Sequence, residues 1–350
     1  MKKNREWVRF YVLVYLEVNV MMKDYVIEKE KPDFEVRTDL AVEEKESFAG
    51  DGGEIEGVVL REWMEDESQV KLTEVKILDE HGAKAMGKPK GTYLTLEAGQ
   101  LARQDDSYHE KVSEELARQI GGLAGDIRQR KIMVVGLGNA SVTPDALGPR
   151  AVGHLQVTRH LEQQYGKDFC RERGLPVISA VVPGVMAQTG METAEIIRGV
   201  IRETRPELLI VIDALAARSI RRLGTTIQLT DTGIHPGSGV GNHRHSLTKE
   251  SLGIPVLAIG VPTVVGAAAI VHDTVDTMIK TLLNSSGTAG MGKYLQDMDP
   301  EEQYELIREL LEPEFGSLFV TPPDIDEMIE SLSYTISEGI HQAVFSGKQL

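Results

Sequence analysis

The fold of this 350-residue chain is constrained most by four short, predominantly apolar runs, in which Ser179 is the single polar residue. They cover residues 132–135, 177–182, 208–212 and 256–259. Continuous runs of this length are typical of strands buried on both faces of a sheet. Helical patterns lie between them, near residues 146–164, 192–204 and 266–284. This alternation predicts a three-layer α/β/α fold with a mostly parallel central sheet, carried by residues 130–284.

The segments on either side of this core indicate two additions. Short β-branched or alternating stretches within residues 57–100 predict a small β-rich subregion beside the main sheet. An amphipathic helix is expected over residues 109–129. Residues 300–350 are expected to form C-terminal helices, near 300–312 and 323–345.

The first residues resemble a signal peptide only loosely. A basic start precedes a short apolar run, residues 10–16, but no small-x-small cleavage site follows and the run is too short to span a bilayer. We interpret residues 1–21 as a start-site extension, with Met21 or Met22 as the natural start. Residues 23–56 are rich in charged side chains and are expected to form an exposed arm.

Composition narrows the function classes. The net charge is −16, and no long basic run is present, so a direct nucleic-acid binder is not expected. Cys170 is the single cysteine, which excludes an intramolecular disulfide and multi-cysteine zinc sites and fits a reducing compartment. No membrane association is expected.

Chemistry is expected where the strands end, because open α/β sheets form their sites outside the carboxyl ends of the strands. The first run is followed by the glycine loop Gly136, Gly138 and Asn139, and then by Asp145. The loop lacks both the third glycine of a dinucleotide fingerprint and the lysine of a P-loop. By position, Asp145 is either a helix cap or a site residue.

Asp213 closes the third apolar run and is expected to be half-buried. It too is either a cap or a site residue. Two carboxyl groups at neighbouring strand ends can share a proton, one acting as general base toward water and the other as general acid toward a leaving amine.

A second glycine-rich loop contains His235, Gly237 and Ser238. Asp145, Asp213 and His235 together would make a metal site with two carboxylates and one imidazole, although no helical H-E-x-x-H motif supports it. Ser238 lacks the strand before it and the helix after it that a nucleophile elbow needs.

Taken together, the chain resembles the spore germination proteases. The resemblance is carried by residues 36–43 (VRTDLAVE), 91–97 (GTYLTLE), 135–139 (VGLGN), 142–149 (VTPDALGP), 183–186 (PGVM), 212–218 (IDALAAR), 231–242 (DTGIHPGSGVGN), 260–265 (GVPTVV) and 320–322 (VTP).

The resemblance implies a fold similar to the hydrogenase maturation endopeptidases and an atypical aspartic mechanism, with Asp145 and Asp213 as the catalytic pair and no cofactor or metal. It implies substrate or site loops containing Gly136, Gly138, Asn139, His235, Gly237 and Ser238. It further implies a zymogen in which residues 1–35 are a prosegment removed at Glu35–Val36, leaving an endopeptidase domain of residues 36–350.

The implied substrates are small acid-soluble spore proteins, cut after Glu and before a large apolar residue. The implied assembly is a homotetramer, in the cytoplasm of the forespore and in the spore core. Two alternatives remain: a metal-dependent or metal-sensing maturation peptidase using Asp145, Asp213 and His235, and a non-enzymatic binding protein in which both acids are caps.

Overall fold

The structure is a computed structural model, and it describes residues 38–48, 55–99, 101, 106–125, 127–128, 130–235, 245–283 and 318–345. All of these residues belong to one compact unit, Val36–Leu350. Several sequence predictions fall outside the described residues: the prosegment with the Glu35–Val36 bond, Gly237 and Ser238, and the helix near residues 300–312.

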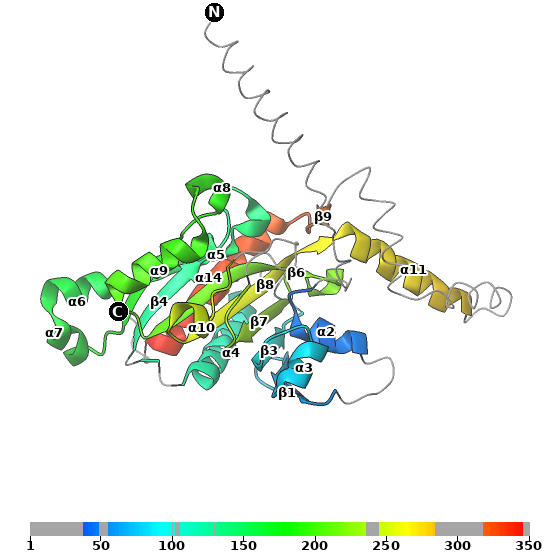
Figure 1. The fold of residues 1–350 in the computed structure, drawn as a ribbon, viewed down its shortest axis with the longest axis horizontal. Coiled ribbons are helices and arrows are strands. Elements are labelled where there is room, and N and C mark those ends of the chain that lie inside the picture. The colour runs from blue at the N-terminus through cyan, green and yellow to red at the C-terminus, as the bar shows by residue number, and fades with distance from the viewer. Residues whose placement is uncertain are drawn as a thin grey trace, which may run out of the picture. The chain divides into compact units, whose positions relative to one another are not determined.

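The four apolar runs form the parallel centre of one sheet. They become β4 (Lys131–Gly136), β5 (Val177–Val181), β6 (Leu208–Ala217) and β8 (Val256–Gly266). These strands pair in parallel in the order β5-β4-β6-β8 (Figure 1). The predicted three-layer α/β/α fold class is confirmed.

Four further strands extend this sheet through antiparallel pairing. β7 (Thr226–Thr230) pairs with β8, and β3 (Gly91–Glu97), β2 (Val70–Ile77) and β1 (Val58–Glu65) follow in that order. The residues expected to form a small sheet of their own therefore continue the central sheet, because β3 pairs with β7. A short strand, β9 (Phe319–Val320), pairs with the last residues of β8.

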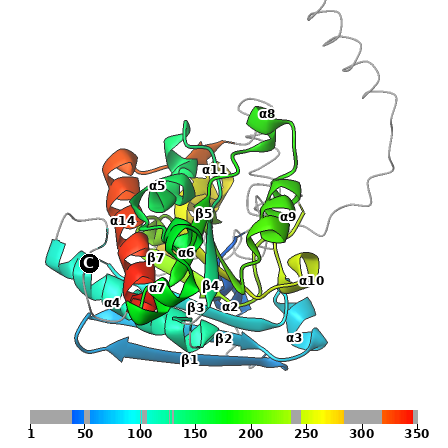
Figure 2. The ribbon, with the colours of Figure 1, turned by 90° about the vertical axis from the view of Figure 1, so that its left-hand side faces the viewer.

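Helices cover both faces of the sheet (Figure 2). On one face lie α4 (Asp106–Ala124), α5 (Leu147–His154) and α14 (Ile325–Val344), packed on a cluster that includes Ile210 and Ile212. On the other face lie α9 (Thr193–Thr204) and α10 (Lys249–Leu252), against a cluster that includes Leu209 and Val211. Side chains of β6 alternate between the two clusters, as expected for a strand buried on both faces.

A third apolar cluster lies at the far end of β6. It joins Leu40 and Val42, at the start of α2 (Ala41–Phe48), to Leu215 and Ala217 of β6 and to Ala269 of α11 (Ala267–Leu283). The remaining elements are short: α3 (Glu80–Ala85), η2 (Thr143–Asp145), α6 (Arg159–Tyr165), α7 (Lys167–Glu172), α8 (Met186–Thr189) and η3 (Ile220–Arg222).

Some boundaries differ from the sequence prediction. β6 and β8 are longer than the apolar runs 208–212 and 256–259 that predict them, because the two strands stay paired as far as Ala217 and Val265. The expected helix over residues 146–164 is split into α5 and α6, since the chain turns extended at Leu155 (ψ 138°).

No helix among the described residues has both the length and the apolar character that crossing a membrane requires.

Candidate active site

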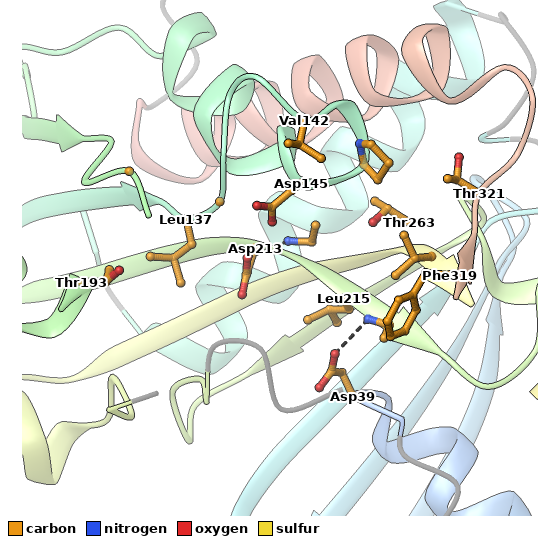
Figure 3. A pocket seen from close by; sticks show the side chains of 16 residues that line it. Asp39, Leu137, Val142, Asp145, Thr193, Asp213, Leu215, Thr263, Phe319 and Thr321 are labelled. Carbon is orange, nitrogen blue, oxygen red and sulfur yellow. Dashed lines mark hydrogen bonds between the residues drawn. The ribbon is translucent and has the colours of Figure 1, made fainter. Parts of the chain in front are cut away.

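A cavity of about 360 Å³ lies beside the ends of β4, β6 and β8. Its wall is made by Asp39, Leu137, Gly138, Val142, Pro144, Asp145, Gly184, Thr193, Asp213, Ala214, Leu215, Ala216, Thr263, Val264, Phe319 and Thr321 (Figure 3). Both acids that the sequence singled out are in this wall. The structure brings both acids to one wall, and the strands nearest to them, β4 and β6, are neighbours in the sheet.

Asp213 lies inside a regular strand. In the ladder it is opposite Gly260 of β8, and the preceding residue, Ile212, is opposite Gly136 of β4. The residue is only 6% exposed, and its Oδ1 accepts the N–H of Ala214 at 3.0 Å. The two flanking strands thus fix the backbone that carries this carboxyl group.

Asp145 lies in η2, on the loop between β4 and α5. Its Oδ2 accepts the backbone N–H of Asn139 at 2.8 Å. The N-cap of α5 is Ala146, which makes no side-chain capping bond. The carboxylate therefore braces the glycine loop after β4, and the capping alternative does not describe its role at α5.

Two glycines allow this loop to lie against β6. Gly138 has φ of +109°, and a Cβ atom there would be 2.0 Å from the backbone oxygen of Asp145. A Cβ at Gly148, in α5, would come within 2.6 Å of the backbone oxygens of both Leu137 and Ile212. Leu137 also donates its N–H to Ile212 at 2.8 Å. The Asp145 loop is thereby tied to the residue that directly precedes Asp213.

A third acid, Asp39, also lines the cavity, and the residue pattern did not single it out. Its backbone N–H donates to the oxygen of Ala216 at 3.1 Å, and its Oδ2 accepts the N–H of Ala216 at 2.9 Å (Figure 3). Asp39 stands in one of the stretches that carry the family resemblance, but no strand end or glycine loop marks it. Its position depends on a contact between residues 177 apart in the sequence.

Further contacts hold the segment around Asp39, which we name the N-terminal clamp (residues 38–43). The buried Glu43 carboxylate accepts the N–H groups of Arg218 and Ser219 at 2.7 and 3.0 Å and pairs with the hydroxyl of Thr38. Gln228 of β7 donates to the oxygen of Asp39 at 3.0 Å. The clamp is therefore hydrogen-bonded to residues 216–219, which follow Asp213 in the chain.

The other predicted site residues are only partly brought together. Gly138 lines the cavity, Asn139 contacts Asp145, and Gly136 is the buried last residue of β4. His235 is not among the residues of the cavity wall. Desolvation and, secondarily, the charge of Lys88 lower the pKa of His235. Within the described residues, no group of three or more His, Cys, Asp or Glu side chains is arranged to hold a metal ion.

The arrangement suits acid–base chemistry. Asp145 and Asp213 face one cavity from different surroundings, a braced loop and a buried strand. Two carboxyl groups in such a setting can divide the roles of proton acceptor and proton donor. Fold and site together define an α/β protein with an acidic site at the carboxyl ends of its central strands.

Comparison with known proteins places this chain in one family. Residues 33–286 match the family model described as germination protease. The chain is 49% identical over 313 residues to the germination protease of Caldanaerobacter subterraneus subsp. tengcongensis, which covers 89% of this chain and 95% of that protein. The germination protease of Clostridium perfringens is 45% identical, with the same coverage. That of Priestia megaterium is 41% identical, covering 89% of this chain and 94% of that protein. The chain belongs to the germination protease family, and it is a peptidase.

Proposed function

We propose that this peptidase is an endopeptidase that degrades small acid-soluble spore proteins during germination, cutting after Glu and before a large apolar residue. The proposal gives the chemistry to Asp145 and Asp213. The observation that supports it best is that these two acids, from separate segments, line one cavity where β4 ends beside β6.

In the proposed reaction the two acids hold one proton between them. The carboxylate of the pair takes a proton from water as the water oxygen attacks the carbonyl carbon of the peptide bond. The protonated partner gives its proton to the leaving nitrogen, so that the carbon–nitrogen bond breaks into a carboxyl group and an amine. Each proton moves between groups that the cavity holds, and neither a metal nor a cofactor takes part.

We further propose that the chain is a zymogen that cuts its own Glu35–Val36 bond, with residues 1–35 as the prosegment. Val36 precedes the cavity-lining Asp39 by three residues, a separation that an extended chain spans in at most about 11 Å. This short separation supports the proposal that the Glu35–Val36 bond can reach the cavity. The remaining parts of the proposal are a homotetramer and a place in the forespore and spore core.

The test replaces each acid by its isosteric amide. We expect Asp145→Asn and Asp213→Asn each to lower kcat for a peptide with a Glu–apolar bond by about a thousandfold or more, because a missing catalytic acid or base leaves only binding and positioning. Circular dichroism and thermal melting check that both variants fold. Full activity in both would sink the acid-pair mechanism.

The same preparations test the other parts of the proposal. Mass spectrometry of wild type held at mildly acidic pH should find a new N-terminus at Val36, absent from both Asn variants. A new end elsewhere would contradict the assigned bond. Loss of wild-type activity in a strong chelator, restored by added metal, would instead support the metal-dependent alternative with His235.

A further inference from the structure

The described cavity wall lacks a partner for the glutamate of the proposed cleavage site. It contains the acidic residues Asp39, Asp145 and Asp213 and no basic residue. A glutamate side chain placed beside three acids is repelled unless a cation stands close to it. This inference rests on the proposed function, and it asks which residue supplies that cation.

Lys88 lies next to the cavity wall. It follows α3 and precedes β3, and it is half-buried. Its Nζ donates to the backbone oxygens of Thr38 and Asp39, at 3.2 and 3.3 Å. These bonds hold the ammonium group against the N-terminal clamp, whose Asp39 lines the cavity.

The ammonium group of Lys88 is held differently from those of three lysines that form ion pairs. Lys71 pairs with Glu62, Lys90 with Glu80, and Lys131 with Glu162. In the part of the chain that the structure describes, Lys88 pairs with no carboxylate and donates to two backbone oxygens. An ammonium group has three N–H donors, so one donor and the full charge are left for an anion.

The charge of Lys88 also reaches the second glycine-rich loop. It contributes to the lowered pKa of His235, after desolvation. His235, which the family resemblance predicts as a site residue, is not among the residues of the cavity wall. Lys88 therefore contributes positive potential at this loop, and the lowered pKa keeps His235 neutral to lower pH than an ordinary histidine.

We propose that Lys88 binds the side-chain carboxylate of the glutamate that precedes the cleaved bond. The same group would serve the chain's own processing, since Glu35 comes three residues before Thr38, a separation of at most about 11 Å. Lys88 then selects glutamate over its neutral isostere, and it acts on specificity while the acid pair carries the chemistry.

Two rival explanations must be separated from this one. Lys88 could serve only to hold the clamp through its two backbone contacts. Arg218 is a rival cation: it follows β6, its backbone N–H bonds to Glu43, and no carboxylate among the described residues pairs with its side chain.

The experiment measures kcat/KM for two peptides that differ only in Glu or Gln before the scissile bond. In wild type we expect the Glu peptide to be favoured by about ten- to a hundredfold, the range of one charge-assisted hydrogen bond. In Lys88→Met, kcat/KM for the Glu peptide should fall by that factor, while kcat/KM for the Gln peptide should change by less than about threefold. The ratio of the two kcat/KM values should then be close to one. Lys88→Arg should restore much of the preference.

Controls make each outcome decisive. Lys88→Gln keeps an N–H donor for the clamp and removes the charge, and it serves if Lys88→Met fails to fold; it should also lose the preference. If Lys88 is purely structural, kcat/KM should fall equally for the two peptides in both variants. That result would overturn the proposal. Loss of the preference in Arg218→Met, with Lys88→Met unchanged, would assign the site to Arg218.

The proposed function fails differently. A wild type that cuts neither peptide would overturn the proposed function and this inference with it. A wild type that cuts both peptides equally would overturn the glutamate preference while leaving the acid pair standing. A wild type with a clear preference that survives in Lys88→Met and Lys88→Gln would overturn the Lys88 assignment alone.

Discussion

Asp145 and Asp213 line the same cavity, but the protein positions them in two different ways. Asp213 is part of a regular strand, with β4 and β8 paired on either side of β6. Asp145 is on an irregular loop, where its carboxylate accepts the N–H of Asn139 and its backbone oxygen lies close to Gly138. The first acid is held by a repeated ladder, and the second by a few local contacts.

This difference shows where the site is sensitive. A ladder spreads a disturbance over many backbone bonds, whereas a loop held by a few contacts moves when one of them is lost. We therefore expect the Asp145 side of the cavity to be disrupted by single substitutions that leave the β6 side in place.

Outside the acid pair itself, the largest effect is expected from Gly138→Ala. The new Cβ would be 2.0 Å from the backbone oxygen of Asp145, at a φ of +109° that alanine rarely adopts. We expect the free energy of unfolding to fall by about 2–4 kcal/mol. Peptidase activity should fall by about a hundredfold, since a small displacement of a catalytic group is costly. Thermal or urea unfolding and a peptide assay measure the two effects.

Gly153→Ala is the matched control. Gly153 is exposed and lies in the last turn of α5, and a Cβ there would meet nothing within 4 Å. Removing a helical glycine should stabilise the protein by about 0.5–1 kcal/mol with activity unchanged. Equal behaviour of the two alanine variants would mean that the loop tolerates displacement and that the comparison between the two acids is wrong.

The sequence was most informative where position follows from periodicity. Four apolar runs predicted β4, β5, β6 and β8, because strands buried on both faces leave a continuous apolar signature, although β5, at the edge of the sheet, is only partly buried. The rule that sites form at the carboxyl ends of such strands then selected Asp145 and Asp213, and both line the cavity.

What the sequence could not predict depends on long-range pairing. β6 continues past Asp213 because β8 runs beside it, and β3 joins the main sheet because β7 lies next to it. Asp39 belongs to the site through its two bonds to Ala216, far along the chain. The local sequence pattern contains no information on which distant strand or residue will be the partner. That pairing is determined by the packing of the whole fold.

A smaller effect is expected at Asp39, on the strand side of the comparison. Asp39→Ala removes the acceptor for the N–H of Ala216, which stands where the pairing of β6 with β8 shifts register. We expect a loss of about 1–2 kcal/mol in the free energy of unfolding, the cost of an unsatisfied donor. Asp39→Asn keeps an acceptor oxygen and should cost less. If both variants lose activity equally, the charge of Asp39 matters more than its hydrogen bond.

The smallest effect concerns the helix that supports the Asp145 side. Thr143, in η2, donates to Asp326 of α14 at 2.8 Å, and Arg150 of α5 pairs with Glu330 of α14 at 3.0 Å. Near the other end of α14, Nε2 of His341 accepts the N–H of Gln156, just after α5, at 2.8 Å. That bond needs a neutral imidazole, so it links the support of the loop to pH.

Burial lowers the pKa of His341, and the nearby Glu338 opposes this only in part. Above an ordinary histidine pKa of about 6.5 both the folded and the unfolded chain hold this ring neutral, so it adds no pH dependence. As the pH falls below that value, the unfolded chain takes up a proton that the folded chain resists, and stability is lost.

We expect wild type to lose more unfolding free energy between about pH 7.5 and 5.5 than His341→Gln, which retains an acceptor but does not titrate. His160→Gln, on the exposed side of α6, should follow wild type. Amide hydrogen exchange should rise on acidification in α5 before it rises in β6; simultaneous opening of both would show that the two sides of the cavity are equally well supported.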